Sequence, residues 1–424
     1  MLIKMQVNSG DIGELQINVV DGNNVPIKDA RVIISRKTNE NEPLDNETTQ
    51  LEQLSTDSSG QTEVVDLDAP PLEYSLDENN DNMPYANYNV EVDAPGYESE
   101  NIDNVEILPR SLAIQNVKLE KVQGEETENI NIPPHTLYYE YPAKIPEDDI
   151  KDVNEPGEIV LSRVVVPEYI VVHDGTPSSN ARDYYVTYKD YIKNVASSEI
   201  YATWPRATLE ANILAIMSFT LNRVYTEWYR NKGYDFTITS STAYDQKWIN
   251  GRNIFESISV VVDSIFDQYL SFPDVRQPIL TQYCDGRRVT CPNWLSQWGS
   301  CNLGEQGYST LEIIRNYYGS EMYINTAEQI AGIPASWPGY DLTIGSSGQK
   351  VQQIQEQLNT IGKVYTAIGN VNVDGIYGED TQRAVRNFQK IFDLPQTGII
   401  DFATWYKISQ IYVGITRIAE GIPR

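Results

Sequence analysis

The chain has few of the residues from which metal sites and nucleophilic catalytic centres are usually built. Its 424 residues include two His, His135 and His173, and three Cys, Cys284, Cys291 and Cys301. A zinc hydrolase generally needs two or more His ligands, and the HExxH pattern is absent. The Cys residues are odd in number and have no nearby His, which favours free thiols or one disulfide over a thiolate metal site. We therefore expect no metal and no cofactor.

Long apolar runs are also missing. No stretch of about 18 or more apolar residues occurs, so no membrane span is expected. The start of the chain, MLIKMQVNSGDIGELQINVV, lacks a basic region followed by an apolar stretch, and so no secretory signal is expected. The sequence thus predicts a protein that begins in the cytoplasm of the cell that makes it.

Basic residues are scarce, above all in the first part of the chain, and the formal net charge is −28. Residues 1–158 carry 34 acidic and 10 basic side chains, residues 159–340 carry 18 and 14, and residues 341–424 carry 8 and 8. Nucleic acid is disfavoured as a partner because phosphate contacts need clustered Lys and Arg. The acidic part is either a solvated surface or a removable segment whose loss leaves a nearly neutral protein, able to approach an anionic wall polymer.

Alternation of apolar and polar residues predicts an all-β sandwich for residues 1–119. ELQINVV and ARVIISRK alternate on either side of a DGNN turn, and YANYNVEVDAPGY and IQNVKLEKV supply later strands. The order of these segments resembles the carboxypeptidase regulatory-like domains. Residues 120–158 are rich in Glu, Asp, Asn and Pro, which predicts an exposed and loosely held linker that is prone to proteolytic nicking.

Residues 159–335 predict a central α+β unit. The run after Trp204 and Pro205 has an apolar face at helical spacing, which predicts a long amphipathic helix. YSTLEIIRNYYG predicts a second helix, with Ser309 as its N-cap and Glu312 completing a capping box. The segment IFESISVVVDSIFDQYL fits helix and strand equally.

Residues 341–424 predict a compact unit of three helices. Apolar stripes mark the first two helices, and Asp401 is placed to cap the third. The fold class predicted for the whole chain is therefore α+β and multidomain: a sandwich, a linker, a central α+β unit and a helical C-terminal unit.

Two motifs of the central unit indicate a chemistry. They are VASSEIYATWP, from Val195 to Pro205, and LSQWGSCNLGEQGYSTLEIIRNYYG, from Leu295 to Gly319. Together they resemble the stage II sporulation protein D family, which are lytic transglycosylases that act on peptidoglycan. The resemblance implies that Glu199 is the catalytic acid and base. Its apolar and aromatic neighbours fit that role, because they disfavour the ionised form of a carboxyl group and raise its pKa.

The same resemblance assigns further residues to the glycan groove. It implies that Ser296, Gln297 and Trp298 line the groove, and that Tyr283 orients either Glu199 or the sugar. The alternative for Trp298 is packing in the core. The chain departs from the family pattern in two places. Met217, Ser218 and Phe219 stand where the family has an Arg-Thr-Tyr triplet, and YDFTITSSTAYDQKW lacks the Cys and His with which some relatives hold zinc.

The C-terminal unit carries its own resemblance. GSSGQKVQQIQEQLN, VDGIYGEDTQRAVRNFQK and LPQTGIIDFATW resemble the three-helix peptidoglycan-binding domains. This resemblance implies docking on peptidoglycan; the alternative is that the unit only packs against the enzyme. The residues expected to contact the wall are Asp374, Gly375, Ile376, Tyr377 and Arg383.

The order of the units resembles the precursors of spore cortex-lytic enzymes. That resemblance implies a zymogen whose partners are spore cortex peptidoglycan and an activating subtilisin-like germination protease. It also implies synthesis in the mother cell, deposition in the cortex or outer layers of the spore, and cleavage within residues 120–158. The sequence leaves two ways open in which the precursor is kept inactive: the sandwich covers the glycan groove, or residues 133–146 occupy it. The rival functions are a non-enzymatic wall or coat binder and a stem-peptide amidase, which the shortage of His disfavours.

Overall fold

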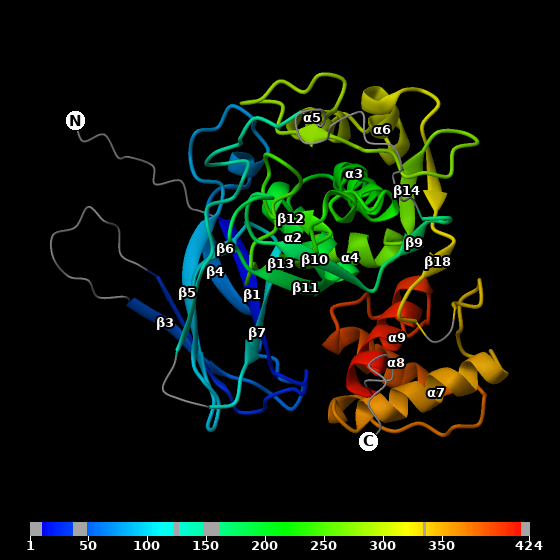
Figure 1. Cartoon of the computed structure of the whole chain (residues 1–424). Helices are drawn as coiled ribbons and strands as arrows, with labels where there is room; N and C mark the ends of the chain where they lie inside the picture. Colours follow the sequence, from blue (N-terminus) through cyan, green and yellow to red (C-terminus); the bar gives the residue numbers. More distant parts are fainter. Residues whose placement is uncertain (1–10, 37–48, 123–126, 147–160, 334–335, 417–424) are drawn as a thin grey trace.

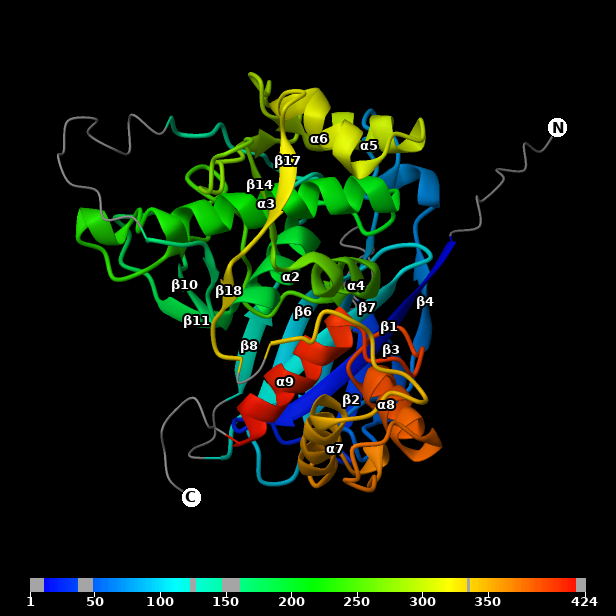
Figure 2. The same cartoon turned by 90° about the vertical axis from the view of Figure 1, so that its right-hand side faces the viewer.

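The computed structural model describes residues 11–36, 49–122, 127–146, 161–333 and 336–416. A β-sandwich, a central helical unit and a C-terminal helical unit lie side by side, and each contacts the other two (Figures 1 and 2). The expected cleavage region lies partly outside the described residues, at 123–126 and 147–160. Among the described residues, no helix is both long and apolar enough to cross a membrane.

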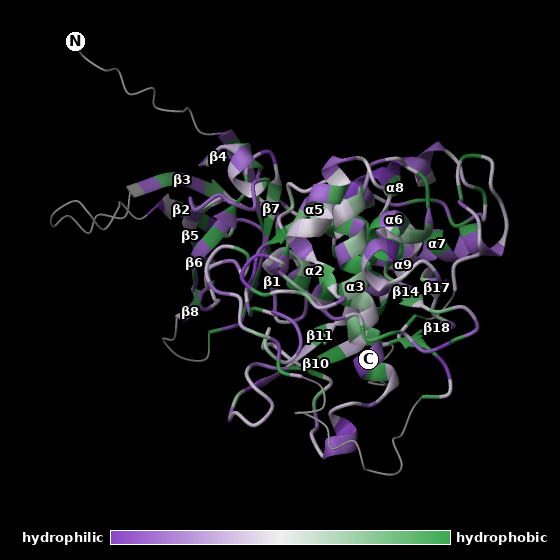
Figure 3. Cartoon of the chain, turned by 90° about the horizontal axis from the view of Figure 1, so that it is seen from above, coloured by the Kyte–Doolittle hydropathy of each residue, from purple (hydrophilic) through white to green (hydrophobic). Residues whose placement is uncertain are grey.

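The N-terminal unit is a sandwich of two sheets, as the alternation predicted. One sheet has the order β13-β7-β1-β4 and the other β3-β2-β5-β6-β8. Side chains alternate between core and solvent along β5, and Figure 3 shows the matching bands of green and purple on the strands. The strand bounds are β1 (Asp11–Asp21), β2 (Arg31–Arg36), β3 (Thr49–Ser55), β4 (Val65–Ala69), β5 (Ala86–Asp93), β6 (Glu100–Ile107) and β7 (Leu112–Leu119), with the short helix η1 (Leu72–Ser75).

Strands from outside residues 1–119 complete both sheets. β8 (Glu128–Asn131) comes from the expected linker and pairs in parallel with β6. β13 (Ile254–Phe255) comes from the central unit and pairs with β7. The described linker residues therefore differ from the loose segment that composition predicted, because their backbone groups find partners on surfaces that are distant in sequence.

The central unit is built around α3 (Arg206–Tyr225), the helix predicted after Pro205. Its residues from Thr208 to Arg223 are almost all buried, including polar ones, so it is not the amphipathic surface helix that was expected. It is buried all round because α2, α4, α5, α6 and β14 pack around it. The neighbouring helices are α2 (Tyr188–Glu199), α4 (Glu256–Ile265), α5 (Gln297–Glu305) and α6 (Thr310–Tyr318).

The remaining elements of this unit are short. The ambiguous segment divides: its first two residues form β13, its middle is α4, and its end lies in β14 (Gln268–Ser271), which pairs with β17. In α6 the capping box of Ser309 and Glu312 is present, as predicted. The other elements are β9 (Val165–Val166), β10 (Tyr169–His173), β11 (Asp183–Thr187), η2 (Arg230–Lys232), β12 (Ile238–Thr239), β15 (Tyr283–Cys284), β16 (Leu295–Ser296), β17 (Tyr323–Thr326) and β18 (Gln329–Ile330).

The C-terminal unit contains the three predicted helices, α7 (Gln349–Gly362), α8 (Glu379–Ile391) and α9 (Phe402–Thr416), with η3 (Thr366–Ile368) between the first two. The Asp401 carboxylate accepts the Thr404 N–H at 2.8 Å, which confirms the predicted cap. The aromatic ring of Phe266 on the central unit packs against Phe402 and Tyr406 of α9. The sandwich also contacts this unit, through a bond from the Gln61 amide to the Ile391 carbonyl at 2.9 Å.

Candidate active site

Glu199 is the last residue of α2, a helix that the sequence did not predict. The Thr187 hydroxyl caps the start of α2, and at its other end Ile200 takes an extended conformation, so the helix stops at Glu199. The Glu199 side chain is fully buried. The end of α2 therefore fixes this carboxyl group inside the protein rather than in a surface loop.

Two donors hold the Glu199 carboxyl group. The Lys247 backbone N–H donates to Oε1 at 2.7 Å, and the Tyr283 hydroxyl donates to Oε2 at 2.5 Å. Burial raises the pKa of Glu199, while the charge of Lys144 and the two hydrogen bonds oppose that rise. A carboxyl group with a raised pKa that is fixed by two donors has the properties of a general acid.

Tyr283 connects the two sequence motifs. It lies on β15, which pairs in parallel with β16, so that Tyr283 stands opposite Leu295 at the start of the second motif. Burial and the negative charge of Glu199 raise the pKa of its hydroxyl well above the ordinary value. The hydroxyl therefore stays protonated at neutral pH and donates to Glu199.

The three predicted groove residues of the second motif do not face an open groove. The Ser296 hydroxyl caps α5 by accepting the Gly299 N–H at 2.9 Å. Trp298 is buried, with its ring centre 5.2 Å from that of Trp204 and 5.9 Å from that of Tyr201. Gln297 is fully buried, and neither polar atom of its amide has a hydrogen-bond partner among the described residues.

The three residues that differ from the Arg-Thr-Tyr triplet of the sporulation protein family pack inside the protein. Met217, Ser218 and Phe219 are buried in α3, where the Ser218 hydroxyl donates to Leu214 O and accepts the Leu270 N–H at 2.7 Å each. They fix α3 to β14 and supply no group to Glu199.

A buried charge cluster occupies the segment in which some relatives hold zinc. The Asp245 carboxylate accepts Arg223 Nε at 2.9 Å, the Tyr229 hydroxyl at 2.6 Å and the Thr239 hydroxyl at 2.7 Å. This cluster braces the loop that presents the Lys247 N–H. No group of three or more possible metal ligands occurs among the described residues.

Cys284 and Cys291 form a disulfide that closes the loop after Tyr283, while Cys301 is a buried free thiol. Of the two alternatives expected for the thiols, the structure has the single disulfide. Inside the loop, the Asp285 carboxylate accepts the N–H groups of Arg287, Arg288 and Val289. The loop is therefore held both covalently and by its own hydrogen bonds.

Part of the expected linker lies beside Glu199, which sequence reasoning anticipated only as a hypothesis for residues 133–146. The Thr136 hydroxyl donates to Ser198 O at 2.7 Å, Tyr141 is buried, and the Lys144 ammonium lies 5.2 Å from the ring centre of Tyr283. Lys144 is the site residue that the sequence did not reveal. The aromatic and proline residues of PPHTLYYEYPAKIP were the available signal.

The wall-binding candidates divide into loop-shaping and exposed residues. The Asp374 carboxylate accepts the Ile376 N–H at 2.8 Å, Gly375 has a φ of +70°, and the buried Tyr377 hydroxyl donates to Gly398 O at 2.9 Å. These three shape the loop. Ile376 is 57% exposed, and Asp374 and Arg383 are exposed too, so these three can contact a ligand.

Residues 347–408 match the family described as putative peptidoglycan binding domain. No curated protein matches the chain. The match places a peptidoglycan-binding unit at the C-terminus and indicates peptidoglycan as its partner.

Several solved structures share short similar parts. The N-terminal domain of SleB is 28% identical over 18% of this chain and 99% of its own, with a TM-score of 0.16. The 3-chlorocatechol 1,2-dioxygenase of Rhodococcus opacus 1CP is 14% identical over 28% of this chain and 62% of its own, with a TM-score of 0.20. The minor pilin GBS52 of Streptococcus agalactiae is 15% identical over 30% and 49%, with a TM-score of 0.18. With TM-scores this low, we base no inference on these likenesses.

Proposed function

We propose that the chain is the precursor of a spore cortex-lytic enzyme of the SleC type, which cuts peptidoglycan glycan strands by lytic transglycosylation. The C-terminal family match supports peptidoglycan as the polymer. The observation that carries the enzymatic part is Glu199, a buried carboxyl group held between the Lys247 N–H and the Tyr283 hydroxyl. It is the residue that the resemblance to the sporulation family selects.

The reaction needs one carboxyl group. Protonated Glu199 donates its proton to the glycosidic oxygen as the bond from the muramic acid C1 to that oxygen breaks. The 6-hydroxyl of the same sugar then attacks C1, and the Glu199 carboxylate takes the proton of that hydroxyl. The products are a free hydroxyl on the leaving sugar and a 1,6-anhydro end on N-acetylmuramic acid, so no water is consumed.

Each neighbour of Glu199 positions a different part of its carboxyl group. The Lys247 N–H and the Tyr283 hydroxyl fix the two carboxyl oxygens, and burial keeps the protonated form accessible at higher pH than for an exposed Glu. In the second half of the reaction the same two donors stabilise the carboxylate before it takes the proton of the 6-hydroxyl.

We further propose that the uncut chain is inactive and that a subtilisin-like protease activates it by removing the N-terminal region at the spore cortex. The charge distribution supports this, since residues 1–158 carry 34 acidic and 10 basic side chains. Their removal leaves a protein close to neutral, which approaches an anionic polymer more readily.

The test is a digest of spore cortex by the cut chain and by its Glu199→Gln variant, followed by mass spectrometry of the fragments. We expect anhydro-muramic ends from the cut chain and a loss of at least a hundredfold in the variant, the scale of general acid catalysis. Free stem peptides would instead support an amidase, and an unchanged cortex would support a wall-binding protein. Cortex binding by the variant, at an undiminished level, is the control that its fold is intact.

A further inference from the structure

We propose that residues 136–145, here named the plug segment, occupy the glycan-binding groove, and that Arg288, which holds this segment, binds the glycan strand once the segment leaves. The proposal rests on the proposed role of Glu199. It adds a substrate-binding residue that neither the family match nor the sequence motifs assign.

The plug segment enters beside the catalytic residue. The Thr136 hydroxyl donates to Ser198 O at 2.7 Å, one residue before Glu199. Leu137 is buried, and the preceding His135 is fully buried with its ring centre 4.6 Å from that of Tyr201 in the first motif. The N-terminal end of the segment is thus anchored on the VASSEIYATWP motif.

The C-terminal end of the segment is held by the loop that precedes Lys247. The Lys144 ammonium donates to Asp245 O at 2.7 Å, and the Ile145 N–H donates to Ala243 O at 2.8 Å. These carbonyls belong to the loop whose Lys247 N–H binds Glu199. Between the two ends lies Tyr141, which is buried with its hydroxyl near the charge of Glu199.

Glu199 is sealed in this arrangement. Its side chain is fully buried, and it lines neither of two cavities in the described part of the chain. The larger of these, about 690 Å³, lies where the three units meet. A sugar chain therefore reaches Glu199 only when a covering element moves, and the plug segment contacts both sides of the site.

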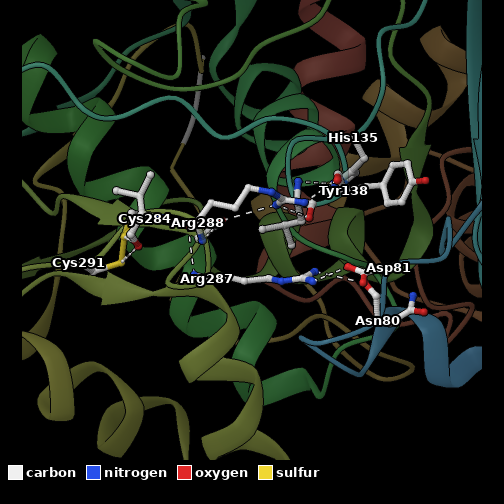
Figure 4. A network of polar contacts seen from close by, with 11 residues as sticks. Asn80, Asp81, His135, Tyr138, Cys284, Arg287, Arg288 and Cys291 are labelled. Carbon is white, nitrogen blue, oxygen red and sulfur yellow. Dashed lines mark hydrogen bonds and ion pairs between the residues drawn. A yellow bond between two sulfur atoms is a disulfide. The ribbon is translucent and has the colours of Figure 1, made fainter.

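The Arg288 guanidinium binds two carbonyl oxygens near the N-terminal end of the segment. Its Nη1 donates to Leu137 O at 2.8 Å and its Nη2 donates to Tyr138 O at 2.5 Å (Figure 4). A guanidinium that binds two carbonyl oxygens also matches the acetamide and lactyl carbonyls of a peptidoglycan strand. The loop around it is closed by the disulfide and by Asp285, so the fork keeps its place when the segment leaves.

Arg287 provides a matched control in the same loop. Its guanidinium contacts the sandwich rather than the plug segment, donating to Asn80 O at 3.2 Å and to the Asp81 carboxylate at 2.8 Å (Figure 4). Its removal is expected to loosen the sandwich without changing how a glycan binds.

The plug segment also affects the protonation of Glu199 through the charge of Lys144. The Lys144 ammonium favours the ionised form of Glu199 and so opposes the rise of its pKa caused by burial. When the segment leaves, Glu199 loses this charge and part of its burial, and these two changes act on its pKa in opposite directions.

The experiment uses the full chain with Glu199→Gln, so that a bound glycan is not consumed. One version carries the recognition sequence of a site-specific protease within residues 147–160, and a second carries it within residues 123–126. The first cut breaks the covalent link between the plug segment and the enzyme, whereas the second leaves that link intact. The probe is a soluble peptidoglycan tetrasaccharide, and the readout is protection from amide hydrogen exchange at residues 243–250 and 283–292, which excludes binding by the C-terminal unit.

We expect protection after the first cut and none in the uncut chain or after the second cut. In the chain cut by the first route, Arg288→Ala should weaken tetrasaccharide binding by roughly tenfold or more, as for a lost charge-assisted fork, whereas Arg287→Ala should change it by less than about twofold. Because the cut part can remain docked, the uncut chain with Tyr141→Ala and Lys144→Ala is tested as well, and it too should gain protection.

Equal protection of the uncut chain, or equal losses for the two Arg variants, would overturn the inference. So would an absence of protection both after the first cut and in the Tyr141 and Lys144 variant. A cut chain that retains Glu199 and binds the tetrasaccharide, yet produces no anhydro ends from cortex, contradicts the proposed function and leaves the assignment of the groove standing.

Discussion

At the scale of single residues, the site depends on a balance around the Glu199 carboxyl group. Burial favours its protonated form, and three neighbours, Lys144, Tyr283 and Lys247, favour the ionised form. A general acid and base must visit both forms in each turnover, so both influences are useful. Each of the three neighbours lowers the Glu199 pKa, so removing any one of them should raise it.

Tyr283→Phe is the clearest test of this balance. The substitution removes the hydrogen bond that stabilises the Glu199 carboxylate, so the Glu199 pKa should rise. Activity of the cut chain falls as pH increases through this pKa, and the alkaline limb should therefore move to higher pH while kcat drops about tenfold, the effect of one charge-assisted hydrogen bond. The measurement is a pH profile of cortex digestion.

Tyr317→Phe is the control for this prediction, because Tyr317 is a partly buried tyrosine of α6 that makes no contact with Glu199 among the described residues. An unmoved alkaline limb in Tyr283→Phe would show that Tyr283 does not position the carboxyl group.

At the scale of elements, the pairing of the linker strand β8 with β6 places two carboxyl groups opposite each other, so its strength depends on pH. Glu100 on β6 stands opposite Glu128 on β8, and burial followed by the charge of Glu128 raises the pKa of Glu100 to about 7. A raised carboxyl pKa contributes stability that is complete below the pKa of the unfolded chain and is lost as pH rises through about 7. The attachment of the linker to the sandwich should therefore weaken as pH rises from 4.5 to about 7 and change little above that.

We expect amide hydrogen exchange at residues 128–131, corrected for the intrinsic rate, to be faster at higher pH, with the change lying between the ordinary Glu pKa of 4.5 and the raised Glu100 pKa of about 7. Glu100→Gln should flatten this dependence, because it removes the titrating group. Glu91→Gln on the neighbouring strand β5 should leave the dependence in place, since Glu91 is half-exposed. A persistent pH dependence in Glu100→Gln would contradict the explanation.

At the scale of the whole molecule, the N-terminal part is integrated with the rest rather than tethered to it. β13 of the central unit joins the sandwich sheet, and Arg252 pairs with Glu106 in a buried contact of 2.5 Å between the two units. A single cut in the chain therefore does not by itself separate them. In the proposed activation, release of the N-terminal part is a second step, opposed by this interface.

Glu106→Ala should speed that second step. It leaves the buried Arg252 charge without its carboxylate, which costs about 3 kcal/mol or more for a buried pair. After the cut within residues 147–160, the N-terminal part should dissociate faster than in the parent chain, as followed by size-exclusion chromatography over time. Glu91→Ala, which breaks an exposed pair with Arg31, should leave the rate nearly unchanged.

Local signals in the sequence predicted the elements whose stability is local. The capping box of Ser309 and Glu312, the cap at Asp401 and the apolar stripes of α7 and α8 all appear as expected, because each depends on residues within one or two helical turns. The alternation of the sandwich strands could be predicted as well, because it too is a local pattern in the sequence.

The sequence by itself determined the helical, peptidoglycan-binding character of the C-terminal unit, and it named Glu199 as a candidate that stays a prediction. Only the tertiary structure decided that Glu199 ends a helix, that Trp298 belongs to the core, and that an acidic, proline-containing linker packs beside the site. Composition describes what a segment can bury alone, whereas residues 136–145 are ordered by surfaces such as Arg288 and Asp245 that lie a hundred or more residues away. Contacts at that separation leave no periodic trace in the sequence, and for this reason the sequence offered residues 133–146 only as one of two alternatives, and Lys144 emerged only from the fold.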